Sequence, residues 1–87
     1  MNNKIYIVIL KYQDCLSDEL FIELATTSKS TAQNKLKELA DIECRTSWIQ
    51  NYGEDEFDRF DITQDYFGAK YDDKITEIWI EEKEIEE

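Results

Sequence analysis

The sequence contains no proline and no histidine, and it has only two glycines among 87 residues. Because proline and glycine favour turns and irregular backbone, their scarcity indicates that regular helices and strands dominate. The lack of histidine removes the commonest transition-metal ligand in proteins, so a metal site of that kind is not expected. A chain of this length and composition is predicted to form a single domain, residues 1–87.

Cysteine is also scarce, with only Cys15 and Cys44 in the chain. Two cysteines this far apart do not make a zinc site, and nothing indicates the secretory context that favours a disulfide. We therefore expect two reduced thiols. Long apolar runs are missing as well. The segment Ile5–Leu10 is too short to span a bilayer and lacks the features of a secretion signal, so the expected location is the cytoplasm.

Motifs for catalysis are absent. No serine, cysteine or lysine stands in a nucleophile motif, and neither glycine belongs to a phosphate-binding loop. Among 21 acidic residues, carboxylate pairs arise by chance, and a chain of this size leaves little room for a deep substrate cleft. No window of residues 54–73 matches an EF-hand, although loose calcium binding to clustered carboxylates stays open. We expect neither an enzyme nor a cofactor.

The acidic residues are concentrated near the end of the chain. Residues 1–53 carry seven acids and six bases, whereas residues 54–87 carry fourteen acids and four bases, a net charge of −10. The whole chain has a net charge of −11 at pH 7. Such a field repels nucleic acids and anionic membranes and attracts basic proteins. A basic protein partner is therefore expected, without direct nucleic-acid or membrane binding.

The first half of the chain predicts a hairpin followed by a helix. Lys4–Tyr12 is apolar on both faces of an extended chain, which is typical of a central strand. Turn-forming residues follow, and Leu20–Thr26 then resumes a strand, so the two segments should pair. Thr27 or Ser28 can cap a helix. The apolar stripe of that amphipathic helix consists of Ala32, Leu36, Leu39 and Ala40.

The middle of the chain has two interpretations. Residues 48–52 suit a short helix that ends at Gly53. Beyond it, acids and rings recur at helical spacing, which predicts a helix with its rings toward the core and its carboxylates toward solvent. The acids are Glu54, Asp58, Asp61 and Asp65, and the other stripe is Phe57, Phe60, Gln64 and Phe67. The alternative is a break near Phe60 with residues 59–63 extended, because Ile62 and Thr63 favour strands.

The last segment, residues 74–87, predicts a strand that frays into an acidic tail. One of its faces mixes carboxylates with Trp79, which indicates an edge strand. The order β-β-α-(α)-β then predicts an α+β domain of two layers. Its sheet is antiparallel and three-stranded with order 2-1-3, and one main helix and one or two short helices pack on it.

The acidic segment from Gly53 to Asp73 holds eight carboxylates, two basic residues and five aromatic residues. Its ordinary interpretation is a solvated surface over a core. The alternative is a binding face, in which the rings hold the backbone and the carboxylates meet basic side chains. Spaced carboxylates on a rigid scaffold can imitate phosphates and compete for the lysines and arginines of a nucleic-acid groove.

A small, proline-free, acidic chain with a hairpin, the helix opening "TTSKSTAQNKLKELA" and an acidic aromatic second half resembles anti-CRISPR and related anti-restriction proteins of phages and mobile elements. The resemblance lies in composition and layout. It implies an inhibitor that acts in the host bacterial cytoplasm. Such an inhibitor occupies, as a nucleic-acid mimic, the basic groove of a defence nuclease, for example an RNA-guided one. The alternative is a small protein-interaction or oligomerisation module without mimicry, in which the edge near Trp79 pairs with another chain or another copy.

The predicted partner-binding residues are acidic side chains of the second half and four rings. The acidic residues are Glu54, Asp55, Glu56, Asp58, Asp61, Asp65, Asp72 and Asp73. The rings are Tyr52, Tyr66 and Tyr71, which can contact arginine, and Trp79 of the predicted edge strand.

Overall fold

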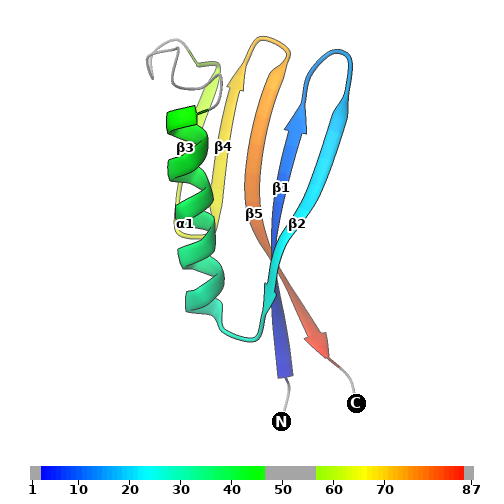
Figure 1. Ribbon diagram of the computed structural model, residues 1–87, viewed down its shortest axis with the longest axis vertical. Coiled ribbons are helices and arrows are strands. Elements are labelled where there is room, and N and C mark those ends of the chain that lie inside the picture. Colours follow the sequence, from blue (N-terminus) through cyan, green and yellow to red (C-terminus); the bar gives the residue numbers. More distant parts are fainter. Residues whose placement is uncertain (1–2, 47–56, 86–87) are drawn as a thin grey trace.

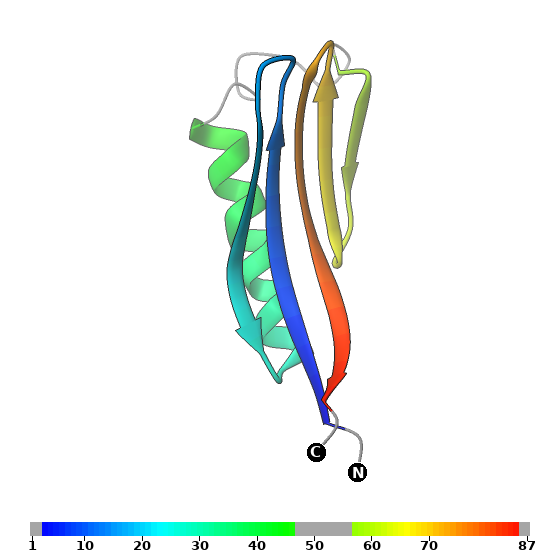
Figure 2. The same cartoon turned by 90° about the vertical axis from the view of Figure 1, so that its right-hand side faces the viewer.

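The computed structural model describes residues 3–46 and 57–85 and shows a sheet with one helix on it (Figure 1). The elements are β1 (Asn3–Gln13), β2 (Asp18–Thr26), α1 (Lys29–Thr46), β3 (Arg59–Ile62), β4 (Tyr66–Tyr71) and β5 (Lys74–Ile85). The five strands are antiparallel in the order β2-β1-β5-β4-β3. Helix α1 lies along one side of the sheet, and no other element of the described residues covers the opposite side (Figure 2).

The prediction of a three-stranded sheet with several helices is therefore wrong. The helix predicted beyond Gly53 is, over the described residues 57–71, replaced by the antiparallel pair β3–β4, in which Ile62 lies opposite Phe67. The extended alternative is confirmed for Arg59–Ile62. Phe60 and Phe67 meet at 5.8 Å between ring centroids because they face the core from neighbouring strands. Their spacing of seven residues arises from a strand, a turn and a strand, and it matches two helical turns only by coincidence.

Strand β1 occupies the middle of the sheet, as its two apolar faces predict. It pairs with β2 along one edge and with β5 along the other, and Val8, Ile9 and Leu10 are buried. The prediction that the last strand is an edge is wrong, because β5 pairs with both β1 and β4. Glu77 and Glu81 of β5 lie on the side of the sheet away from α1, where a carboxylate reaches water even from an interior strand.

The helix begins and packs as its sequence predicts. The Ser28 Oγ accepts the backbone N–H of Thr31 at 3.2 Å, which caps an otherwise unpaired donor of the first turn. The apolar stripe of α1 is buried against side chains of β1, β4 and β5. The resulting core consists of Ala32, Leu36, Leu39 and Ala40 from the helix and Val8, Leu10, Phe67, Ala69 and Ile78 from the sheet.

The two faces of the sheet differ in their cover. Residues alternate along a strand, so Val8 and Leu10 of β1 face the helix while Ile5, Ile7 and Ile9 face the other way. We call the side that carries these three isoleucines the uncovered face. Ile9 is only 7% exposed and yet lies outside the helix-side core; on the uncovered face its partners across the two ladders are Ile22 and Trp79.

Candidate functional site

The structure spreads the predicted binding residues over several places. Tyr52, Glu54, Asp55 and Glu56 lie outside the described residues, as does the short helix predicted over residues 48–52. Of the others, Asp61 lies on β3 and Asp58 directly before it, Tyr66 and Tyr71 lie on β4, and Trp79 lies on β5. Asp65 belongs to the turn between β3 and β4, and Asp72 and Asp73 to the turn between β4 and β5.

The described carboxylates of this set hold parts of the fold together. The Asp58 Oδ2 accepts the backbone N–H of Asp72 at 2.9 Å, and Asp72 has a positive φ of 54° in that tight turn. The Asp61 Oδ2 lies 2.6 Å from the Arg59 Nε. The Asp65 Oδ1 accepts the side-chain amide of Gln33 of α1 at 2.9 Å. Each of these three carboxylates therefore has a hydrogen-bond or ion-pair partner within the same chain, at its surface.

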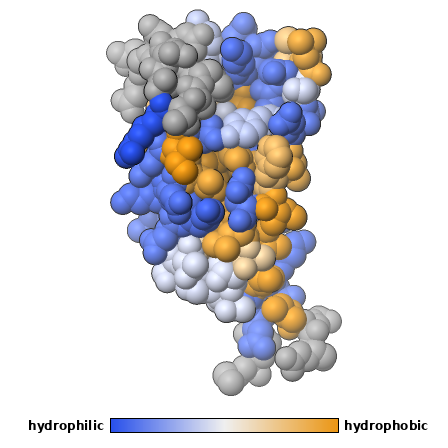
Figure 3. Space-filling view, viewed as in Figure 1, coloured by the Kyte–Doolittle hydropathy of each residue, from blue (hydrophilic) through white to orange (hydrophobic). Residues whose placement is uncertain are grey.

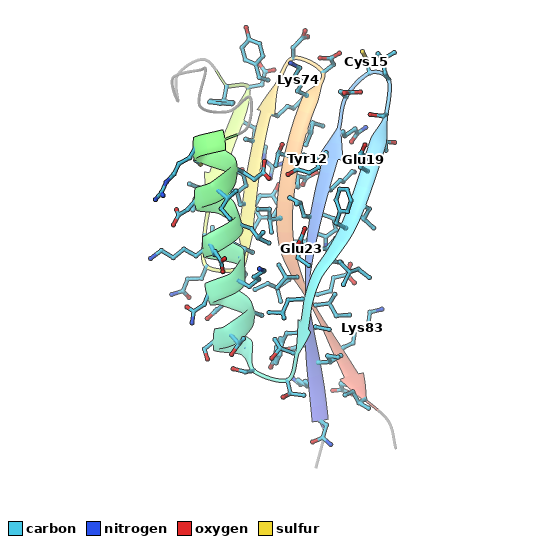
Figure 4. The ribbon with its side chains drawn as sticks, in the orientation of Figure 1. Tyr12, Cys15, Glu19, Glu23, Lys74 and Lys83 are labelled. Carbon is cyan, nitrogen blue, oxygen red and sulfur yellow. The ribbon has the colours of Figure 1, made fainter. Side chains whose placement is uncertain are left out.

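The loop between β1 and β2 meets the turn between β4 and β5 at one end of the molecule, where Figure 4 labels Cys15 and Lys74. A hydrogen bond to Asp73 and the charge of that carboxylate raise the pKa of the Cys15 thiol. Asp14 accepts the backbone N–H groups of Leu16 and Ser17, both at 2.8 Å, and these bonds lower the pKa of its carboxyl. A raised thiol pKa leaves less thiolate, so Cys15 lacks the activation of a nucleophilic cysteine.

On the uncovered face, Tyr66 lies across Gly68 to reach the next strand. Its hydroxyl donates to the Glu77 Oε2 at 2.7 Å, and the Arg59 guanidinium lies 5.5 Å from its ring centroid. A Cβ at position 68 would come within 2.7 Å of the Tyr66 ring carbons, so a larger residue there would force the Tyr66 ring to move. Trp79 lies opposite Tyr66 and donates to Glu81 at 3.3 Å. Trp79 therefore lies on a strand inside the sheet, beside Tyr66 and Glu81 on the uncovered face, and not at the sheet edge that the sequence predicts.

The hydrogen-bonded pair of Tyr66 and Glu77 predicts a specific pH response. Burial, followed by the hydrogen bond to Glu77, raises the pKa of Tyr66 to about 12 from an ordinary value of 10.0. The folded state then holds the phenolic proton more tightly than the unfolded chain. The stability from this pair is fully present below pH 10 and is lost as the pH rises through about 12.

Absorbance titration and denaturant melts of the wild type and of Tyr66→Phe between pH 8 and 12 test this response. Tyr66→Phe should lose the phenolate signal that appears as the pH approaches 12, together with the matching fall in stability. Glu77→Gln removes one cause of the shift, so Tyr66 should titrate closer to 10.0 in that variant. An unchanged titration in Glu77→Gln would contradict the hydrogen bond.

Among the described residues, the longest run of consecutive exposed apolar side chains lies on β2, one of the two edge strands. Three consecutive side chains stand out of the surface: Leu20 is 60% exposed, Phe21 43% and Ile22 70%. Leu20 and Ile22 lie on the uncovered face, and Phe21 lies on the helix side, 6.1 Å from the Tyr12 ring. We call Leu20–Ile22 the exposed β2 segment. Figure 3 shows that apolar surface also continues on the helix side, beside α1.

Carboxylates accompany the exposed β2 segment on the helix side. Figure 4 shows Tyr12, Glu19 and Glu23 on the β1–β2 hairpin. The Tyr12 hydroxyl donates to the Glu43 Oε1 of α1. Burial, that hydrogen bond and the charges of Glu43, Glu23 and Glu19 together raise the pKa of Tyr12. Glu43 is 6% exposed, and within the described chain its Oε2 has no hydrogen-bond partner. This side of the hairpin is therefore strongly negative.

A hollow lies between α1 and β3, the edge strand at the other end of the sheet. Its volume is about 460 Å³, and its lining includes Leu36, Ala40, Cys44 and Ile62. Ile62 is 58% exposed. Strand β3 is four residues long, whereas β2 has nine, and β3 carries the Arg59–Asp61 ion pair, so it offers a shorter and more polar edge.

The exposed β2 segment is not among the binding residues predicted from the sequence. A signal for it was present, because "LFI" places apolar side chains on both faces of a strand that was already expected at the end of the sheet. A strand in that position has one free backbone edge, and apolar side chains on both of its faces cannot all be covered.

Comparisons with known proteins give no assignment: no protein-family model, curated protein or solved structure matches this chain. In the part of the chain that the structure describes, no helix is long and apolar enough to cross a membrane. Among the same residues, no group of three or more cysteine, aspartate or glutamate side chains is arranged to hold a metal ion. An inference about function therefore depends on the surface of the described residues.

Proposed function

We propose that this chain is an acidic protein-binding module, and that its partner is a basic protein that docks on the exposed β2 segment. The observation that carries the proposal is the run of three exposed apolar side chains on the outermost strand. Exposed apolar runs of this kind are costly for a soluble surface and mark interaction sites. The net charge of −11 supports a partner of opposite charge, because complementary fields speed association and select partners.

Matched threonine variants test the proposal. The tagged chain is used to capture a partner from an extract of the cells that encode it, and the purified partner is then titrated by calorimetry. The double variant Leu20→Thr/Ile22→Thr places threonine, a β-branched residue that suits strands, at both positions and removes apolar contact area. Its dissociation constant should rise at least about tenfold, since truncating central apolar anchors commonly costs more than about 1 kcal/mol.

Ile62→Thr is the control, because it makes a similar change at an exposed site on the opposite edge strand. It should bind within about twofold of the wild type, as peripheral contacts contribute little. All variants should show the same circular dichroism spectrum. A partner that binds the double variant as tightly as the wild type would contradict the proposal, and so would binding that Ile62→Thr abolishes.

An inhibitor that mimics nucleic acid in the groove of a defence nuclease is a second candidate. What supports it is the net charge of −10 over residues 54–87. If it holds, added nucleic acid displaces the chain from its partner, and affinity falls steeply between low and moderate salt. Docking on the exposed β2 segment predicts no such displacement, although its complementary charge also makes the affinity depend on salt. The same titrations, repeated with competitor DNA or RNA, therefore separate the candidates.

A further inference from the structure

The outer edge of β2 presents free backbone groups. Along an antiparallel ladder, hydrogen-bonded residue pairs alternate with pairs that are not hydrogen-bonded. In the loop at the end of the hairpin, the Asp14 N–H donates to the Ser17 carbonyl, so Asp14 and Ser17 form a hydrogen-bonded pair. Counting from that pair, Glu19 and Phe21 exchange hydrogen bonds with β1. Leu20 and Ile22, in the intervening pairs, then point their N–H and C=O groups away from β1. No strand of residues 3–46 or 57–85 pairs with that edge.

This edge carries only part of the usual protection against strand pairing. Protein edges are blunted by proline, by charged side chains, especially lysine, by bulges or by short strands. The chain has no proline, β2 holds no basic residue, and the strand is nine residues long. A bulge does occur, because Leu24 lies opposite Val8 and Ile22 opposite Ile9, which leaves Glu23 as the extra residue. Residues 18–22 before the bulge remain regular and open.

The two sides of this edge differ in chemistry. On the uncovered face, a strand added next to β2 would lie beside the apolar side chains of Leu20 and Ile22. On the helix side, it would lie beside Phe21, which is flanked by the carboxylates of Glu19 and Glu23. Since successive residues of a strand point to opposite faces, a complementary strand alternates apolar and basic residues.

A second copy of this chain fits the edge poorly. An antiparallel two-fold pair centred on Phe21 would place Glu19 of each copy opposite Glu23 of the other. Like charges directly opposite one another across a ladder are destabilising, and each copy carries a net charge of −11. The charge of the edge therefore selects a basic strand.

We propose that the partner supplies an extended segment of alternating apolar and lysine or arginine residues, which pairs with the outer edge of β2 and continues the sheet. The backbone groups of Leu20 and Ile22 provide the ladder, and the two rows of side chains provide the selectivity. This inference rests on the proposed function, in which the exposed β2 segment is the docking site, and adds how the partner binds there.

The test uses a seven-residue peptide of alternating lysine and valine, with a glutamate–valine peptide as its counterpart. The full chain should bind the lysine peptide and not the glutamate peptide. Hydrogen exchange should then slow at the Leu20 and Ile22 amides, while the Glu19 and Phe21 amides are already protected by β1. Slowed exchange at other residues only, equal binding of both peptides, or no binding would overturn the inference.

A proline variant separates strand pairing from simple apolar contact. Leu20→Pro removes an outward N–H, and proline is tolerated at such positions of edge strands. Leu20→Ala is the matched control, which truncates the side chain but keeps the N–H. Peptide affinity should be at least about tenfold lower in Leu20→Pro than in Leu20→Ala, and Glu19→Gln/Glu23→Gln should also weaken binding of the lysine peptide. Equal affinities of the proline and alanine variants would overturn the inference.

Two further outcomes separate this inference from a dimer and from the proposed function. If sedimentation shows a wild-type dimer that Leu20→Pro dissociates, the second copy is the occupant and this inference fails. If the captured partner loses affinity for Leu20→Thr/Ile22→Thr but binds Leu20→Pro and Leu20→Ala equally, the proposed function stands and strand pairing alone fails.

Discussion

Replacing Phe67 by alanine is expected to lower the free energy of unfolding by about 3–5 kcal/mol, the range for deleting a fully buried phenylalanine. Phe67 is completely buried in the core between β4 and α1, and its ring meets the Phe60 ring edge to face. A cavity at this site would be lined by the rigid sheet and by the helix, so the surroundings can collapse only in part.

Urea melts of the wild type and Phe67→Ala measure this loss, and Phe67→Leu should show a smaller one. Ile62→Ala is the control within the same β3–β4 hairpin, because Ile62 lies opposite Phe67 and is 58% exposed. Its effect should stay within about 0.5 kcal/mol, as is usual for surface positions. A loss below about 1 kcal/mol for Phe67→Ala would show that the β3–β4 pair does not close the core.

Replacing Leu36 by alanine is expected to cost about 2–4 kcal/mol, because this side chain occupies the centre of the helix–sheet interface. Leu36 is 1% exposed and belongs to the apolar stripe of α1. The neighbouring Lys37 is exposed, so Lys37→Ala provides a control one residue away with little expected change. Denaturant melts of both variants show which face of the helix packs against the sheet. Equal effects of the two substitutions would contradict the observed packing of α1.

The elements that local signals define were predictable. The Ser28 cap and the spacing of Ala32, Leu36 and Leu39 lie within one short stretch of chain, so the sequence alone places the helix. The hairpin of β1 and β2 also joins neighbouring segments. The middle position of β1 follows from its apolar residues on both faces.

The rest depends on contacts between distant residues. The spacing of Phe60 and Phe67 fits two helical turns as well as two strands joined by a turn, and only the pairing of β4 with β5 decides between them. Glu77 suggested an edge strand, yet it accepts a hydrogen bond from Tyr66 on the uncovered face of an interior strand. The periodicity of one segment carries no information on such neighbours.

The candidate site was the least predictable part. The sequence drew attention to carboxylates such as Asp58 and Asp61, which bind Asp72 and Arg59 inside the molecule. The exposure of Leu20 and Ile22 follows from the position of β2 beyond β1 and from the location of α1, which are properties of the assembled fold. The net charge can be counted from the sequence, whereas the exposed β2 segment can be recognised only in the folded structure.

The pairing of β1 with β5 has a consequence for the order in which the molecule can form. Asn3 lies opposite Ile85, and even the nearest partners in this ladder, Gln13 and Ile75, are 62 positions apart (75 − 13). Closing such long loops costs entropy before any contact is gained, and contacts between distant residues slow folding. On the ribosome, β1 can pair with β2 early, but its other edge waits for the last strand to be synthesised. Until then one edge of the apolar strand β1 is unpaired, and a chaperone or a neighbouring chain can bind there.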